Sequence, residues 1–254
     1  MVRRRAGSTN PAEPMNNGRI YALKSMKKEI PNLLTLGNLL AGCIGLWFVM
    51  QGDLVSASYC IFISLVCDFF DGFLARALQA YSDLGKELDS LADMVTSGVV
   101  PGIIMYHLID NVSSGVPALK YVGLLLTLGA CYRLAKFNID TRQSDSFIGL
   151  PTPAMSLFVI VLPLIQMDTD LDFIRSLLAN PYFLIIITLL LTYLMNAELP
   201  LFSLKFKNYN FKKNGLKYLF LIASLLLLLS LEYIGIPLVI LLYVVLSMIH
   251  NLTT

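Results

Sequence analysis

Long apolar runs recur along nearly the whole of this 254-residue chain, each of about 18 residues or more. A helix of that length crosses the ~30 Å hydrocarbon core of a bilayer. The composition agrees, because 56% of the residues are hydrophobic and only 14% are charged, unlike a soluble protein. We therefore predict an all-α polytopic membrane protein. Its turn signals predict a bundle of eight spans, near residues 32–51, 54–80, 84–109, 117–138, 152–167, 181–199, 216–233 and 235–251.

The distribution of basic residues predicts the orientation of these spans. With the N-terminus in the cytoplasm, 17 of the 19 Lys and Arg residues fall on the cytoplasmic side, and only Lys120 and Arg175 fall outside. Cytoplasmic loops of membrane proteins carry such an excess of basic residues. We therefore expect an integral protein of the cytoplasmic (inner) membrane with both termini in the cytoplasm.

The chain divides into four regions by composition. Residues 1–17 are basic and polar, and are predicted to form a disordered tail. Residues 18–30 are predicted to form either a short interfacial amphipathic helix on anionic lipid or a solvated basic linker. Residues 31–199 should form a six-helix core, and residues 200–254 should add two C-terminal transmembrane helices.

Four aspartates stand inside this apolar sequence at helical spacing. Asp68 and Asp71 share one face of the second span, and Asp89 and Asp93 share one face of the third. The turn between these spans is short, so the four carboxylates should face one another across a cleft that opens to the cytoplasm. Carboxylates are costly inside a membrane. Divalent cations that prefer oxygen ligands, Mg²⁺ or Mn²⁺, would offset their repulsion.

Small residues and one arginine accompany the aspartates. Gly72 lies in mid-helix, where glycine costs about 1 kcal/mol relative to alanine, and Ala75 continues its face. Such a face would let a phosphate approach the backbone, or would serve close helix packing. Gly85 opens the third span, where free N–H groups favour anions. Arg76 carries a guanidinium suited to phosphate oxygens.

Polar residues on two other spans could complete a substrate site. Asn32, Thr35 and Asn38 share a face of the first span, and could read the edge of a cytosine or bond to a neighbouring helix. Arg133 and Lys136 lie at the cytoplasmic end of the fourth span. They could meet a carboxylate or phosphate, or anchor the helix among lipid headgroups.

The aspartates, small residues and arginine form one pattern, Asp68-x2-Asp71-Gly72-x2-Ala75-Arg76-x8-Gly85-x3-Asp89-x3-Asp93. This pattern resembles the complete signature of the CDP-alcohol phosphatidyltransferase family. The resemblance implies transfer of a phosphoryl-linked group from a CDP-linked donor to an alcohol, with CMP leaving. It also implies two divalent cations as cofactors, Mg²⁺ or Mn²⁺, and a homodimer.

The same resemblance implies a role for each matched residue. Asp68, Asp71 and Asp89 would bind metal. Asp93 would help to hold the second ion and would act as the general base for the acceptor hydroxyl. The CDP and diphosphate group would be bound by Gly72, Ala75, Arg76 and Gly85. We add Asn32 and Thr35 to this set from the polar face of the first span.

Three further stretches, near residues 31–38, 88–101 and 133–153, resemble the phosphatidylserine synthase branch of the family. This implies transfer of the phosphatidyl group from CDP-diacylglycerol to the hydroxyl of L-serine, giving phosphatidylserine and CMP. Arg133, Lys136 and Asn138 would then bind the acceptor. Lys136 stands where the branch has arginine, which keeps the charge but loses the two-pronged geometry.

Other functions fit parts of the pattern. Another acceptor, glycerol 3-phosphate or inositol phosphate, would use the same chemistry but would need a cluster of basic residues near the metals. A divalent-metal transporter would also place carboxylates in the membrane, but should spread them across its depth. A purely structural membrane protein would not need them at all. No feature of the sequence indicates nucleic acid as a partner, whereas membrane lipids are expected partners.

Overall fold

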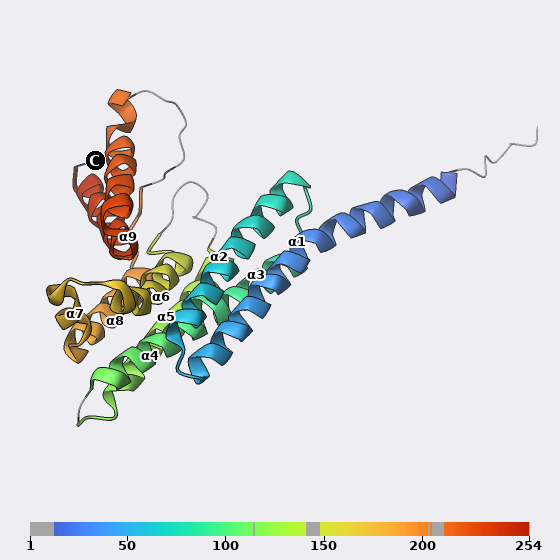
Figure 1. Cartoon of the computed structure of the whole chain (residues 1–254). Coiled ribbons are helices and arrows are strands. Elements are labelled where there is room, and N and C mark those ends of the chain that lie inside the picture. Colours follow the sequence, from blue (N-terminus) through green and yellow to red (C-terminus); the bar gives the residue numbers. More distant parts are fainter. Residues whose placement is uncertain (1–12, 114, 141–147, 203, 205–210, 254) are drawn as a thin grey trace, which may run out of the picture.

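The computed structural model describes residues 13–113, 115–140, 148–202, 204 and 211–253, and this part of the chain is almost entirely helical (Figure 1). Its only pairing of extended residues is an isolated bridge between Ile148 and Pro200. The elements in chain order are α1 (Glu13–Met50), α2 (Leu54–Ala77), α3 (Asp83–Asp93), the π-helical segment η1 (Met94–Val99), α4 (Val100–Val112), the 3₁₀ segment η2 (Leu119–Leu124), α5 (Leu125–Ile139), α6 (Thr152–Asp168), α7 (Asp172–Leu178), α8 (Pro181–Asn196) and α9 (Phe211–Thr253).

Helices α1 and α2 lie antiparallel, side by side, and carry much of the site (Figure 1). The turn between them uses Gly52 at φ +80°, a conformation that glycine adopts without strain. Asp53 then caps α2 by accepting a hydrogen bond from the Ser56 backbone N–H at 2.9 Å. This tight turn fixes which residues of the two helices face each other.

The third predicted span is built from α3, η1 and α4 in succession. Ser82 caps α3 by accepting a hydrogen bond from the Gly85 backbone N–H at 3.0 Å. Directly after Asp93 the helix widens into η1, a feature often found at functional sites. The α-helical form resumes in α4, whose first turn holds Pro101. Asp93 therefore stands at the point where the helix changes its winding.

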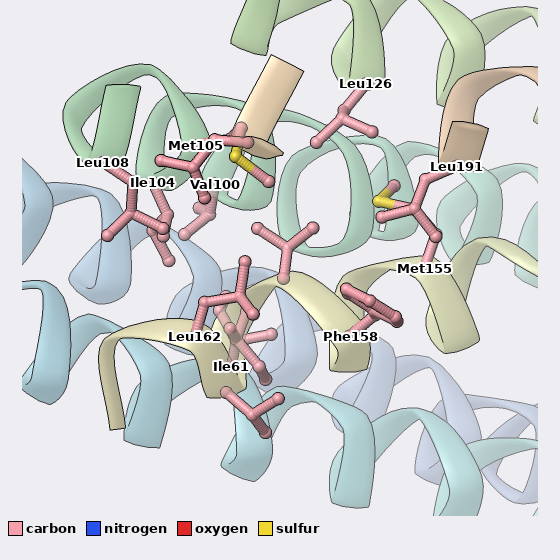
Figure 2. Packing of buried hydrophobic residues seen from close by; sticks show 14 of the residues in the cluster. Ile61, Val100, Ile104, Met105, Leu108, Leu126, Met155, Phe158, Leu162 and Leu191 are labelled. Atoms are coloured by element: carbon pink, nitrogen blue, oxygen red, sulfur yellow. The ribbon is translucent and has the colours of Figure 1, made fainter. Parts of the chain in front are cut away.

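The apolar core lies where α4 and α6 pass between the other helices (Figure 2). Ile104 and Met105 of α4, Ile61 of α2 and Met155 of α6 belong to this cluster, and all four are fully buried. Many large apolar side chains elsewhere on the molecule are exposed. That distribution suits a protein whose outer surface contacts lipid tails.

Within the described residues, five helical segments are long and apolar enough to cross a membrane, and the bent pair α7 and α8, turned by 74°, would make a sixth. The predicted class, an all-α polytopic membrane protein, is confirmed at this level. The count is lower than eight because α6 has only 17 residues and because the two halves of α9, which is broken at Glu232, are counted as one segment. The five segments are Glu29–Met50, Leu54–Ala77, Asp83–Val112, Leu119–Ile139 and Asn214–Leu252.

Helix α9 is broken at Glu232, which has φ 47° and ψ −119°. The rings of Phe220 and Tyr243, on opposite sides of the break, lie 5.5 Å apart. Two residues 23 positions apart can be this close only if the helix folds back, as Figure 1 shows. The two halves correspond to the predicted spans 216–233 and 235–251.

The N-terminal region forms one continuous helix with the first span. Helix α1 begins at Glu13 and continues through Pro31, so the expected interfacial segment 18–30 lies inside it. Residues 13–17, expected in the tail, are also helical. Residues 1–12, the rest of the expected tail, lie outside the described residues.

Candidate active site

Three of the four predicted aspartates form one tight cluster between α2 and α3. Asp68, Asp71 and Asp89 each offer a carboxylate oxygen, and the three oxygens lie within 4.8 Å of one another. The predicted spacing explains this, because each pair shares a helix face and the two helices are joined by a short turn. Asp93 lies one turn further along α3, outside this group of three but in contact with Asp68.

The donor set of the cluster fits a divalent cation. Among the side chains that the structure describes, the ion pairs join Lys120 to Asp110 and Lys136 to Glu198, and none involves the cluster. Three carboxylates with no such partner carry a charge that needs a cation, and oxygen ligands suit Mg²⁺ or Mn²⁺. Asp68, Asp71 and Asp89 are therefore the residues that could hold a metal.

Helix α1 contributes hydrogen bonds to two of the aspartates. The Thr35 hydroxyl lies 2.5 Å from Asp71 Oδ2 and 3.1 Å from the Pro31 carbonyl oxygen. One turn deeper, Asn38 Nδ2 donates to Asp93 Oδ1 at 3.4 Å. The polar face predicted on the first span therefore points at the carboxylates. Of the two roles expected for Asn38, reading a cytosine edge or bonding to a neighbouring helix, the structure shows the second.

A pocket of about 220 Å³ adjoins the cluster between α1, α2 and α3. It brings together all six residues predicted to bind CDP and diphosphate, with Asp71 and Asp89 also in its wall. A Cβ added at Gly72 would meet only Arg76 Nη1, at 3.9 Å, so close helix packing does not explain this glycine. The six residues are Asn32, Thr35, Gly72, Ala75, Arg76 and Gly85.

A second pocket, of about 160 Å³, lies on the other side of Asp89, between α3, α5 and the start of α6. It shares Lys86 and Asp89 with the first pocket and has Asp93 in its wall. The two hollows therefore meet at the carboxylates. A donor in one and an acceptor in the other would have their reacting groups at that junction.

A sequence model that describes CDP-alcohol phosphatidyltransferases matches residues 28–194. The chain belongs to this family. The carboxylate cluster and both pockets lie inside the matched region.

Several proteins with one name are similar to half or more of this chain. The CDP-diacylglycerol–serine O-phosphatidyltransferase of Bacillus subtilis is 36% identical over 174 residues, 67% of this chain and 88% of the relative. The protein of the same name from Helicobacter pylori is 32% identical over 175 residues, 68% of this chain and 72% of the relative. One from Methanocaldococcus jannaschii is 31% identical over 131 residues, 52% of this chain and 58% of the relative.

The three residues predicted to bind the acceptor have different surroundings. Arg133 and Asn138 line the second pocket. Lys136 does not; it lines a separate, much smaller hollow and pairs with Glu198 at 3.3 Å. The lysine therefore has a surface partner of its own in this member of the family.

Arg133 is engaged mainly with the backbone. Its Nη1 donates to the carbonyl oxygens of Ile148 at 2.8 Å and Met195 at 2.9 Å, and its Nη2 donates to that of Gly149 at 3.2 Å. Arg133 is buried. Its hydrogen bonds join α5 to the segment before α6 and to the end of α8. Arg133 thus shapes the wall of the second pocket.

The structure adds residues that the sequence patterns did not single out. Lys86 lines both pockets, and its Nζ donates to the Asn138 carbonyl at 2.9 Å. Tyr81 and Ser82, in the turn between α2 and α3, line the first pocket. Lys86 follows the signature residue Gly85 directly, which is the one signal in the sequence that could have indicated it.

Proposed function

We propose that this protein transfers the phosphatidyl group of CDP-diacylglycerol to the hydroxyl of L-serine, giving phosphatidylserine and CMP. The observation that carries the proposal is the pair of pockets that meet at Asp89. One contains every residue expected to bind the donor, and the other contains the expected general base. The names of the similar family members support serine as the acceptor.

The donor would occupy the first pocket. Arg76 offers a guanidinium that suits the diphosphate, and the missing side chain at Gly72 leaves room for a phosphate beside the backbone. Asn32 and Thr35 present polar groups to the same space. These residues would hold the diphosphate against the carboxylate cluster, with the two acyl chains in the bilayer.

The acceptor would occupy the second pocket, beside Asp93. The serine hydroxyl oxygen attacks the phosphorus of the phosphatidyl group, the bond from that phosphorus to the CMP oxygen breaks, and the hydroxyl proton passes to the Asp93 carboxylate. Asp68, Asp71 and Asp89, with help from Asp93, would hold two divalent cations, Mg²⁺ or Mn²⁺. Bound there, the cations would offset the negative charge of the diphosphate and of the leaving CMP.

Membrane topology is part of the proposal. Eight passes, with both termini and the site on the cytoplasmic side, follow if α6, the α7–α8 pair and each half of α9 count as one pass. The distribution of basic residues supports this orientation. We also propose that the chain divides into the regions 1–17, 18–30, 31–199 and 200–254, as the composition predicts. Assembly as a homodimer belongs to the same proposal.

The central experiment measures lipid products of the purified protein. With CDP-diacylglycerol, radiolabelled L-serine and Mg²⁺ or Mn²⁺, we expect phosphatidylserine and CMP in equal amounts, and loss of both when EDTA removes the metal. Parallel reactions contain glycerol 3-phosphate or inositol phosphate. Product with one of these and none with serine would refute the acceptor. Metal uptake into vesicles without any lipid product would favour a transporter instead.

The metal site is tested by neutral replacements. Asp71→Asn and Asp89→Asn should each lower transfer by more than about 100-fold, because each removes a charged oxygen ligand. Asp110→Asn is the matched control, since Asp110 pairs with Lys120 away from both pockets and should keep its activity. Full transfer in both cluster variants would refute the site.

A further inference from the structure

Two fully buried polar side chains connect the interior of the bundle to Asp93. Ser64 of α2 and Asn38 of α1 have no exposed surface. The Ser64 hydroxyl donates to Asn38 Oδ1, and Asn38 Nδ2 donates to Asp93 Oδ1 at 3.4 Å. The three residues come from three different helices. We call the first two the Ser64–Asn38 relay.

The relay has a definite direction. A side-chain amide has an acceptor end and a donor end, and its two orientations differ only in which end faces which neighbour. The Asp93 carboxylate can only accept, so it requires the N–H end of the amide. The Ser64 hydroxyl can donate or accept, and here it donates to the oxygen end. Reversal would place the amide oxygen against a carboxylate oxygen. The Asp93 carboxylate therefore selects this orientation of Asn38, and the Ser64 hydroxyl stabilises it by donating to the amide oxygen.

Asp93 needs such support because of its place in the chain. It is the last residue of α3, directly before the wider winding of η1, so its backbone is not held by a regular helix on both sides. The hydrogen bond from Asn38 engages one of its oxygens and restricts rotation of the carboxylate plane. Asp93 also lines the second pocket.

We propose that Ser64 and Asn38 are positioning residues that set the orientation of Asp93 for the acceptor. This rests on the proposed function, in which Asp93 receives the hydroxyl proton. Ser64 lines neither pocket, so it can act on Asp93 only through Asn38. A change at Ser64 should therefore alter the rate of transfer without altering the residues that bind substrate.

The decisive variant is Ser64→Ala, and the chain offers a matched control. Ser58 also lies on α2 and is also fully buried, but its hydroxyl donates to the Leu54 carbonyl of its own helix at 2.8 Å. Ser58→Ala therefore removes an equivalent buried hydroxyl that does not lead to Asp93. Ser64→Thr keeps the hydroxyl and serves as the conservative rescue.

The expected result separates kcat from KM. Ser64→Ala should lower kcat about 10-fold and Asn38→Leu about 100-fold, the range typical of residues that orient a ligand or catalytic group. The KM values for serine and CDP-diacylglycerol should stay within about twofold. Ser58→Ala and Ser64→Thr should retain the wild-type kcat. The Ser64→Ala/Asn38→Leu double variant should be no slower than Asn38→Leu alone, because both act through one path.

Several results would overturn the inference. One is an equal kcat for Ser64→Ala and Ser58→Ala, both recovered as folded protein with similar Tm. Another is a rise in both KM values that accounts for the whole loss, since that would indicate a merely structural role. Asp93→Asn tests the proposed function separately: retained transfer would refute Asp93 as the base, whereas an inactive Asp93→Asn with a fully active Ser64→Ala would refute the relay alone.

Discussion

Replacement of Gly72 by alanine should change stability and activity in opposite directions. Gly72 lies inside α2, where glycine costs about 1 kcal/mol relative to alanine. The added methyl group would meet only Arg76 Nη1, at 3.9 Å, which is ordinary contact. No clash therefore opposes the gain in helix stability. Gly72→Ala should raise the free energy of unfolding by about 0.5–1 kcal/mol. This corresponds to a Tm increase of up to about 4 °C.

The same methyl group should weaken donor binding. Gly72 lines the pocket proposed for CDP and diphosphate, and the methyl occupies space that a phosphate would use. Overfilling a well-packed site typically costs about 1–3 kcal/mol, which lowers kcat/KM for CDP-diacylglycerol by about 5- to 150-fold. A higher Tm together with a lower kcat/KM would exclude general loss of structure as the cause of the lower activity.

Gly37→Ala provides the matched control for this prediction. Gly37 also lies inside a helix, α1, and an added methyl there would meet only Cys67 Sγ, at 3.9 Å. It lines neither pocket, so this variant should gain similar stability and keep its activity. Thermal unfolding in detergent and initial rates at varied CDP-diacylglycerol provide the measurements. A lower Tm for Gly72→Ala, or an unchanged kcat/KM, would refute the reasoning.

Two further predictions concern Arg133, in the wall of the second pocket, and Gly149, whose carbonyl oxygen accepts a hydrogen bond from it. Arg133→Met removes three hydrogen bonds to carbonyl oxygens, and should lower the free energy of unfolding by about 2–4 kcal/mol. Lys136→Met breaks an exposed ion pair, and should change the free energy of unfolding by less than about 1 kcal/mol. Equal Tm values for the two variants would contradict this role of Arg133. Gly149→Ala should be strongly destabilising, because Gly149 has φ +74° and its new methyl would lie 2.6 Å from the Met195 carbonyl oxygen. Gly115→Ala, at φ +94° in open space, should cost only the about 1–2 kcal/mol of backbone strain, so a similar Tm for both glycine variants would show that the close contact is unimportant.

Part of the site was predictable because it depends on short-range geometry. Asp68 and Asp71 are three residues apart, and Asp89 and Asp93 are four apart, so helix periodicity alone puts each pair on one face. A short turn joins the two helices, and both pack against α1. The cluster of Asp68, Asp71 and Asp89 follows from these two facts.

The surroundings of Arg133 and Lys136 could not be predicted in the same way. Both were candidates for binding an anion, because both are basic and stand at the same end of the fourth span. Their partners, however, are the carbonyl of Met195, 62 residues away from Arg133, and the side chain of Glu198, 62 residues away from Lys136. Helix periodicity contains no information on which distant segment approaches a given face.

The sequence by itself determined the class of the protein and the place of its carboxylates. Hydrocarbon thickness sets the length of the apolar runs, and the cost of charge in a membrane makes four aspartates at helical spacing a strong signal. The tertiary structure decided how the other residues are used. It placed two pockets on either side of Asp89, engaged Arg133 with backbone carbonyls, and connected Ser64 to Asp93 through Asn38. These contacts join segments far apart in the chain, so they depend on how whole helices pack.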